Sequence, residues 1–272
     1  MKALKVLARS RSPSFTRHYL RRQTPGEPRT VCRVAWWSGD GKPVDYRRGT
    51  SDVALVYDVL FKPGRKSEYW LPEALQPKRV LDIGANIGVT ARYLAHRFPN
   101  AEIHCFEPIE ENLAMLRGNV AGCKVTVHPY GLAAASRIAE FTIPREVETN
   151  WGNYSMLARD GDASSRRSAR VRAVREVLGE IGGASIDLIK IDVEGAEADI
   201  LGAVPDDALA QVTWIYGELH DALNPGGSFG ILARLAQWFD IEVHKPMRKR
   251  GWFFDACRKD SSHRFGSFRR GR

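Results

Sequence analysis

The stretch Val80-Leu-Asp-Ile-Gly-Ala-Asn-Ile-Gly88 decides the fold of this 272-residue chain. A short apolar strand runs into an acid, Asp82, then into a glycine-rich turn, and helix-like sequence follows as far as Phe98. The segment 102–107 then reads as a second strand that ends on another acid, Glu107. On an open α/β sheet this pairing is typical of a site for an adenosine-containing cofactor, because the turn admits the ligand and the second carboxylate can meet ribose hydroxyls.

The residues of the turn indicate which cofactor. A dinucleotide fingerprint, G-x-G-x-x-G, needs its second glycine for close approach of a pyrophosphate and its third for helix packing. Here those two positions hold Asn86 and Val89, which disfavours a nicotinamide oxidoreductase. A side chain at position 86 is compatible with S-adenosylmethionine, which has no pyrophosphate, and Asp82 is then expected to face the ammonium group of the methionine. The alternative interpretation is a generic strand-turn-helix whose glycines serve packing alone.

Composition sets broad limits. Hydrophobic residues make up 43% of the chain, which is ample for the core of one large α/β domain with extensions. No apolar run approaches the ~20 residues needed to cross a bilayer, and the amino-terminal segment lacks the apolar region of a secretory signal. The four scattered cysteines read as reduced thiols of a cytoplasmic protein.

The net charge of +9 is concentrated at the two ends of the chain. Residues 1–34 hold nine Lys and Arg against one acid, and residues 245–272 hold ten against two, which leaves the middle at −7. The body is therefore mildly acidic. The basic ends suit peripheral contact with a polyanion or an anionic membrane surface, or they are solvated tails; no specific nucleic-acid partner is predicted.

Alternating strand and helix patterns predict a doubly wound, mostly parallel seven-stranded sheet with an amino-terminal extension. The expected strands cover 79–83, 102–107, 124–128, 186–192, 212–219 and 240–244, with a final antiparallel strand at 251–255. Expected helices cover 52–61, 88–98, 109–120, 172–181, 195–203 and 227–239, and 139–143 reads as an edge strand. We therefore divide the chain into a basic, partly disordered segment (1–34), a cap (35–78), a cofactor-binding domain (79–245), and a last strand with a basic tail (246–272).

A second motif, Ile186-Asp-Leu-Ile-Lys-Ile-Asp-Val-Glu-Gly-Ala-Glu197, places dense charge beside a strand that reads as buried. Such charges need partners or a catalytic task. In the structural interpretation, Lys190 forms an ion pair with one carboxylate while Glu197 faces solvent. In the functional interpretation, Asp192 and Glu194 lie at the ligand-binding edge of the sheet, as do Glu218 and His220 after a later strand.

These motifs, with Phe106-Glu-Pro108 and Asn112, resemble the FkbM family of S-adenosylmethionine-dependent methyltransferases. The resemblance covers about residues 48–220 and implies a class I methyltransferase fold and O-methylation of hydroxylated natural products or glycans. An upstream Arg48-Gly-Thr-Ser-Asp52 and Tyr69 resemble an extension of members associated with sugars. One departure is Val171-Arg-Ala-Val-Arg-Glu-Val-Leu178, which stands where the family commonly has a Thr-Leu-Asp segment.

Methyl transfer to an alcohol needs in-line alignment and removal of a proton. The candidate catalytic residues are Asp192, Glu194 and His220, and His220 is the cleaner base because imidazole titrates near neutrality; equally, His220 could only orient Glu218. Asp192, Glu218 and His220 could instead hold a divalent cation, which is not predicted. The predicted cofactor-binding residues are Asp82, Gly84, Ala85, Asn86, Gly88, Glu107, Pro108, Asn112, Ser51, Tyr69 and Gly131.

The acceptor is expected to be a small molecule or glycan, with the loop 150–155 and the aromatic side chains of Trp252 and Phe253 shaping its pocket. The alternative function is an RNA methyltransferase that uses the basic termini. Against it, the Asn/Asp-Pro-Pro-aromatic turn of amino-methylating enzymes is absent where Asp192-Val-Glu-Gly195 stands. The sequence does not define an oligomeric state.

Overall fold

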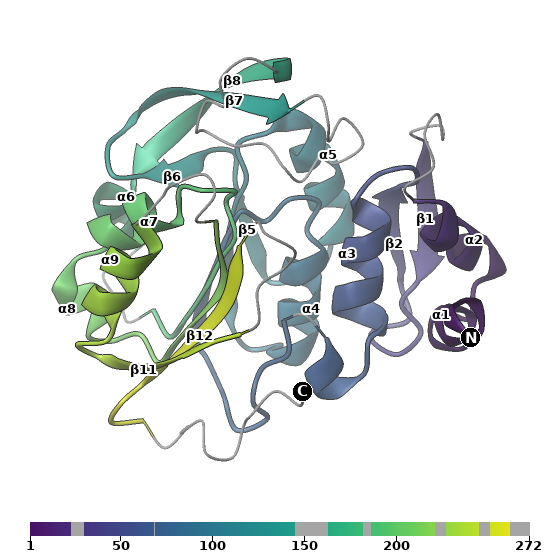
Figure 1. The fold of residues 1–272 in the computed structure, drawn as a ribbon, viewed down its shortest axis with the longest axis horizontal. Coiled ribbons are helices and arrows are strands. Elements are labelled where there is room, and N and C mark those ends of the chain that lie inside the picture. Colours follow the sequence, from purple (N-terminus) through teal and green to yellow (C-terminus); the bar gives the residue numbers. More distant parts are fainter. Residues whose placement is uncertain are drawn as a thin grey trace.

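A seven-stranded sheet runs through the centre of the molecule in the computed structural model, which describes residues 1–22, 30–67, 69–144, 163–181, 186–220, 227–244 and 251–261 (Figure 1). Its strand order is β11-β12-β10-β9-β3-β4-β5. The strands are β3 (Arg79–Ile83), β4 (Glu102–Phe106), β5 (Val125–His128), β9 (Leu188–Ile191), β10 (Trp214–Leu219), β11 (Phe239–Val243) and β12 (Trp252–Arg258). β12 is antiparallel to both of its neighbours, and the other pairings are parallel. The mostly parallel seven-stranded sheet predicted from sequence is confirmed.

Helices cover both faces of this sheet. On one face lie α4 (Val89–Arg97) and α5 (Glu110–Asn119), which bury Leu94 and Leu116 in one apolar cluster. On the other face lie α6 (Val174–Glu180), α7 (Glu197–Ala203) and α9 (Gly227–Leu235), with the short α8 (Asp206–Leu209) beside them. The two apolar clusters are separated by the sheet, which is the doubly wound arrangement.

A separate three-stranded sheet lies beyond the ligand-binding edge. It consists of β6 (Gly131–Ala133), β8 (Ala163–Ala173) and β7 (Arg137–Pro144), in that order. The strand predicted at 139–143 therefore exists within β7, but it pairs with β8 and not with the main sheet. The predicted helix at 172–181 begins only at 174, because β8 extends to Ala173.

The amino-terminal extension packs against α4 and α5. Its elements are α1 (Lys2–Ser10), α2 (Pro13–Arg21), β1 (Val31–Ala35), β2 (Pro43–Arg47), α3 (Asp52–Val56), a π-helical turn η1 (Tyr57–Phe61) and a 3₁₀ turn η2 (Gly64–Lys66). β1 and β2 pair as an antiparallel hairpin. The helix predicted over 52–61 is present, but its second half is π-helical.

The prediction of disorder near the amino end is wrong for residues 2–21. Ser12 caps α2 by accepting a hydrogen bond from the Phe15 N–H, and Pro13 occupies the first turn, where its missing N–H costs nothing. Both helices bury apolar side chains, so they are held by packing against the body. The basic tail predicted after residue 261 lies outside the described residues, as do residues 245–250.

Within the described part of the chain, no helix has the length and apolarity required to span a bilayer. All four cysteines are free thiols, as expected from their scattered positions.

Candidate active site

The glycine turn after β3 is held by backbone contacts with the two adjacent strands. The N–H groups of Gly84 and Ala85 both donate to the carbonyl oxygen of Phe106, at the end of β4. Gly84 has a φ of +79°, and a Cβ atom there would lie 1.9 Å from the Asp192 carbonyl oxygen. The turn therefore requires glycine at this position, because β9 approaches its backbone too closely for any side chain.

Asn86, the next pocket residue of the turn, has a φ of 49°, a left-handed conformation that asparagine tolerates better than most residues. Its N–H donates to Glu107 Oε2 at 2.9 Å, and its side-chain oxygen is buried without a hydrogen-bond partner among the described residues.

Glu107 is positioned by three donors. Besides Asn86, the Ile109 N–H and the Asn112 amide donate to Oε1, at 3.0 and 3.3 Å. Burial raises the pKa of Glu107 although these hydrogen bonds favour its ionised form. The carboxylate consequently has a fixed orientation at the end of β4, where ribose hydroxyls were predicted to bind.

The amino-terminal extension supports this arrangement through Asn112. Arg47 on β2 makes a buried ion pair with Asp52, with its Nε 2.7 Å from Oδ2. A second guanidinium nitrogen of Arg47 donates to Asn112 Oδ1 at 2.8 Å. Asn112 thus accepts from the extension and donates to Glu107, which links β2 and α3 to the carboxylate at the end of β4.

Asp82 does not reach the cavity. It is fully buried, and its Oδ1 lies 3.2 Å from the ammonium nitrogen of Lys190. Lys190 also donates to the Gly84 carbonyl oxygen at 2.7 Å. Burial alone would lower the pKa of Lys190, but pairing with Asp82 outweighs it and raises that pKa. The ion pair that the structural interpretation expected for Lys190 is therefore present, and Lys190 joins the glycine turn to β9. Asp82 is used in this pair, so the geometry does not support its expected contact with the methionine ammonium.

A cavity of about 610 Å³, partly open to solvent, lies between the glycine turn, the end of β9 and the small sheet. Polar side chains of Asn86, Glu107 and Asn112 line one part, and Asp192 and Glu194 line another. The remaining lining residues are apolar side chains or glycines: Ile83, Gly84, Phe106, Pro108, Ile109, Gly131, Leu132, Phe141 and Val193.

Most of the predicted site residues meet at this cavity, and five cofactor-site predictions do not. Ala85 is buried inside the turn, and Gly88, whose Cβ would lie 2.6 Å from Leu116, serves the packing of α4 on α5. Ser51 lies at the start of α3 with no capping hydrogen bond from its side chain, and it does not line the cavity. Tyr69 is buried, but its hydroxyl donates to Asp192 Oδ2 at 2.9 Å, so it orients a lining carboxylate. Asp82 is the fifth.

Of the acceptor-pocket predictions, residues 150–155 lie outside the described residues. Phe253 contacts the Tyr69 ring edge-on at 6.5 Å, and Trp252 is 39% exposed.

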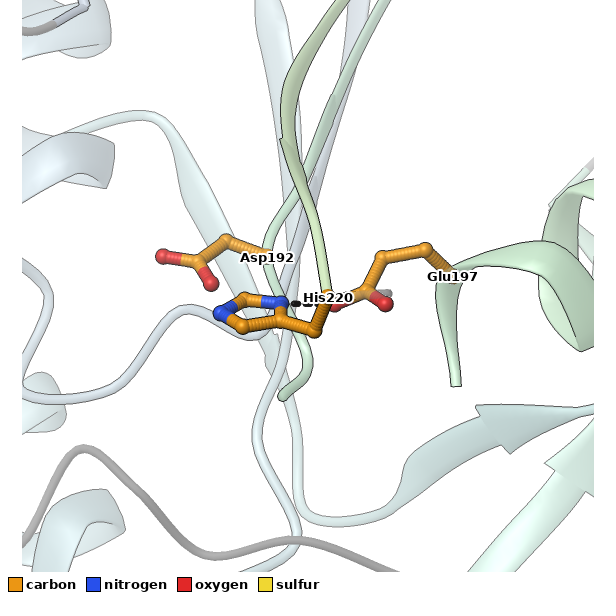
Figure 2. Close-up of side chains that lie close together, drawn as sticks. All are labelled: Asp192, Glu197 and His220. Atoms are coloured by element: carbon orange, nitrogen blue, oxygen red, sulfur yellow. Dashed lines mark hydrogen bonds and ion pairs between the residues drawn. The ribbon is translucent and has the colours of Figure 1, made fainter. Parts of the chain in front are cut away.

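Behind Asp192 and Glu194 lies a cluster of charged side chains centred on His220. Figure 2 shows the imidazole between the carboxylates of Asp192 and Glu197. Nδ1 of His220 donates to Glu197 Oε1 at 2.8 Å, because a carboxylate can only accept. Nε2 lies 3.4 Å from a carboxylate oxygen of Glu194 and 3.4 Å from one of Glu218.

The protonation of this cluster follows from its contacts. Burial would lower the pKa of His220, but hydrogen bonds to Glu197 and Glu218 raise it to about 12. Burial raises the pKa of Glu194 to about 8 and that of Glu218 to about 7. His220 is therefore an imidazolium at neutral pH and does not line the cavity. This geometry disfavours the predicted role of His220 as a neutral base.

Sequence reasoning missed Glu197. In the structural interpretation it faced solvent, but it is 2% exposed, accepts from the backbone N–H groups of Val193 and Gly195, and binds His220. Its position at the first turn of α7 was the available signal, since a carboxylate there can accept the unpaired backbone donors of a helix start. Phe141 was missed because its strand, β7, was predicted as an edge strand of the main sheet. Arg47 was missed because the sequence around it gives no sign of its contact with Asn112, which lies far along the chain.

Asp192, Glu197 and His220 each offer a possible metal ligand, with the ligand atoms within 4.8 Å of one another. Glu197 replaces Glu218 of the predicted set. A cation could bind His220 only after the imidazolium has lost a proton, and Glu197 already accepts three hydrogen bonds from two backbone N–H groups. This donor set satisfies itself without a metal.

Comparison with known proteins gives one family. The model of the methyltransferase FkbM domain matches residues 82–257. Curated relatives include the 31-O-demethyl-FK506 methyltransferase FkbM of Streptomyces tacrolimicus, 28% identical over 63% of this chain and 80% of that protein. Others are the 2-O-methyltransferase NoeI of Sinorhizobium fredii, 28% identical over 52% of this chain and 63% of that protein, and the AMB antimetabolite synthetase AmbE of Pseudomonas aeruginosa, 32% identical over 52% of this chain but only 8% of that protein.

Among solved structures, the O-methyltransferase TomG from Streptomyces achromogenes, in complex with SAM, matches with a TM-score of 0.41 and 14% identity, covering 67% of this chain and 74% of that chain. A likeness this distant carries no argument about the site. The family match, in contrast, covers more than half of the chain and includes the glycine turn, the Lys190–Glu197 motif and the sheet that joins them. The chain belongs to the FkbM family of methyltransferases.

Proposed function

We propose that this protein transfers the methyl group of S-adenosylmethionine to a hydroxyl oxygen of a saccharide or another hydroxylated small molecule. The observation that carries the proposal is one cavity with two separate carboxylate ends. Glu107 stands where a ribose would bind, and Asp192 and Glu194 stand where an acceptor hydroxyl would lose its proton.

The residues present fit this cofactor. Gly84 lines the cavity with its backbone alone, and the side-chain oxygen of Asn86 offers a buried acceptor at the turn. Glu107 holds a fixed orientation for two adjacent hydroxyl donors. The apolar side chains of Phe106, Ile109 and Leu132 form walls against which an adenine ring can pack.

Bound S-adenosylmethionine supplies a methyl group on a positively charged sulfur. The chain must align the acceptor oxygen with that methyl group and take up the hydroxyl proton. Glu194 is our candidate base, because it lines the cavity and its pKa of about 8 matches the proton affinity that a base needs near neutral pH. Its φ of 55° is a left-handed conformation, an energetic cost that is common at functional sites.

His220 and Glu197 act behind Glu194 as positioning residues. The imidazolium lies 3.4 Å from the Glu194 carboxylate and is itself fixed by Glu197. Asp192, held by Tyr69, is the second carboxylate facing the acceptor.

The choice of a hydroxyl acceptor rests on relatives whose names state O-methylation, FkbM and NoeI. FkbM is named for 31-O-demethyl-FK506, and NoeI for a 2-O position. The acidic body of this chain suits a neutral or cationic small molecule better than a phosphate polymer.

The test is methyl transfer from isotopically labelled S-adenosylmethionine to a panel of saccharides and hydroxylated natural products. Release of S-adenosylhomocysteine identifies an acceptor, and NMR of the product locates the methyl group on oxygen, nitrogen or carbon. A chelator in parallel reactions should leave turnover unchanged. With an acceptor in hand, Glu194→Gln should lower kcat by about 10²–10⁴-fold while cofactor affinity is retained.

Glu110→Gln is the matched control, since Glu110 is exposed at the start of α5 and lies outside the cavity. Methylation of nitrogen, or of RNA in place of every small hydroxylated acceptor, would contradict the proposal.

A further inference from the structure

The amino-terminal helices α1 and α2 have apolar side chains on two opposite faces. The inner face is accounted for, because Val6, Phe15 and Tyr19 are buried in the core. Phe15 contacts the rings of Tyr46 and Phe61 at centroid distances of 5.3 and 5.4 Å. These contacts hold the helix pair to the body, at the outer edge of the molecule in Figure 1.

The outer face carries three leucines that the described residues leave partly exposed. Leu4 is 70% exposed, Leu7 37% and Leu20 47%. Leu7 and Leu20 come from different helices and line one shallow groove together with Pro13 and the base of Arg17. Packing within the protein therefore accounts for the apolar side chains of the inner face. It does not account for the exposed leucines of the outer face.

Positive charge surrounds these leucines. Residues 1–22 contain seven Lys and Arg and no Asp or Glu. Several of the cations are used within the fold, since Arg9 donates to the Tyr57 hydroxyl and Arg11 stacks on Trp37. Lys5 and Arg17 have no ion-pair partner among the described residues, and they flank the exposed leucines on α1 and α2.

We propose that the basic leucine surface, formed by Leu4, Leu7, Leu20, Lys5 and Arg17, docks the protein on an anionic lipid bilayer. Helices that lie in a membrane interface combine leucines, which enter the acyl boundary, with Lys and Arg, which meet acidic headgroups. The two helices are already folded and fixed to the body, so docking does not have to order them. The protein would lie on the membrane and not cross it.

Two other occupants fit the surface less well. A nucleic acid would neutralise the cations, but its phosphates leave the leucines exposed to water. A second copy of this chain would bury the leucines, but it would bring two surfaces together in which residues 1–22 carry only positive charge. An anionic bilayer satisfies both features.

The proposal predicts two separable contributions to binding. Each Lys or Arg near an anionic bilayer strengthens binding by about fivefold, so Lys5→Gln with Arg17→Gln should weaken partitioning by about 25-fold. Each leucine that enters the acyl boundary contributes on the order of tenfold, so Leu4→Ser with Leu20→Ser should weaken partitioning by about 100-fold. Salt should weaken the binding of the leucine variant as strongly as it weakens that of the wild type.

The experiment is co-sedimentation of the full chain with vesicles. Equimolar phosphatidylglycerol and phosphatidylcholine form the anionic vesicles, and phosphatidylcholine alone forms the neutral ones. The wild type should partition to the anionic vesicles only. Controls for the two variants are Ile138→Ser with Phe229→Ser, which are 70% and 77% exposed elsewhere, and Arg117→Gln with Lys124→Gln. All four proteins should have unchanged melting temperatures, because the substituted side chains lie on the surface.

Failure of the wild type to bind anionic vesicles would overturn the proposal. So would wild-type partitioning of the leucine variant, which would reduce the surface to a general attraction of charge. The last measurement is binding of a single-stranded RNA oligonucleotide, monitored by fluorescence anisotropy. Tighter binding to RNA than to vesicles would indicate that the cations bind nucleic acid, and it would also overturn the proposal. None of these results bears on methyl transfer.

Discussion

At the scale of single residues, the carboxylates of the cavity differ in how they are held, and the proposed division between cofactor binding and chemistry follows this difference. Glu107 is fixed by backbone and amide donors, whereas Glu194 faces an imidazolium. A group held only by hydrogen bonds suits recognition of hydroxyls. A group whose charge depends on a neighbouring cation suits proton transfer.

Replacing Glu107 by alanine should weaken S-adenosylmethionine binding by about 10–100-fold, because hydrogen bonds to an ionised acceptor contribute about 1.5–3 kcal/mol. Isothermal calorimetry measures this change, with NADH as a ligand that neither protein should bind. Glu110→Ala, at an exposed position three residues further on, is the control. Equal affinity of wild type and Glu107→Ala would remove Glu107 from the cofactor site.

Replacing His220 by asparagine tests its positioning role. The imidazolium favours the ionised form of Glu194, so its loss should raise the pKa of Glu194 above about 8. The base must be deprotonated, so turnover rises with pH, and this rise should move to higher pH in His220→Asn while cofactor affinity stays unchanged. His96→Asn, at an exposed position on α4, should leave the profile in place. A His220→Asn profile that coincides with the wild type would show that His220 does not act on the base.

These residue roles were only partly predictable from sequence. Glu107, Asp192 and Glu194 were predicted to lie together, and they do line one cavity, because strand ends in a parallel sheet point to one edge. The protonation of His220 was not, because it depends on Glu197, twenty-three residues away along the chain. Asp82 was misplaced because the sequence does not show that Lys190 emerges beside it on the neighbouring strand.

At the scale of elements, the glycine turn is the best-predicted part of the site, because its glycines and the apolar strand before it are recognisable in the sequence. The ends of the main-sheet strands were predicted to within about three residues, because their apolar runs are bounded by turns. β8 was missed because its sequence, rich in Arg and Ser, has no apolar run. The two amino-terminal helices were missed because their basic composition outweighed an apolar spacing that became meaningful only with a surface to pack on.

Gly84→Ala tests the turn as an element. A methyl group there meets the Asp192 carbonyl, and the left-handed backbone adds about 1–2 kcal/mol, so both stability and cofactor binding should fall. Gly118→Ala is the matched control: that glycine lies in α5 with no atom within 4 Å of an added Cβ, and the change should stabilise the protein by about 0.5–1 kcal/mol. Urea unfolding measures both. A Gly84→Ala protein as stable as the wild type would contradict the close approach of β9.

At the scale of the whole molecule, the ion pair of Asp82 and Lys190 joins β3 to β9 at the middle of the sheet. Lys190→Met should cost about 3–5 kcal/mol, because it leaves a carboxylate buried without a partner. Asp82→Leu combined with Lys190→Met should recover most of that loss, since two apolar side chains need no partners. Urea unfolding of the single and double variants measures this coupling, and a double variant as destabilised as Lys190→Met would show that the loss does not come from leaving Asp82 unpaired.

The order of β10, β12 and β11 has a consequence for synthesis. A nascent chain leaves the ribosome amino end first, so β10 and β11 emerge before the strand that must lie between them. Until residues 252–258 arrive, the backbone groups along one side of β10 have no partner, and Leu219, next to His220, pairs only later with Trp252. Catalytic competence is therefore gained only after β12 has been synthesised, and ribosome-bound intermediates that end before β12 should be the ones that chaperones retain.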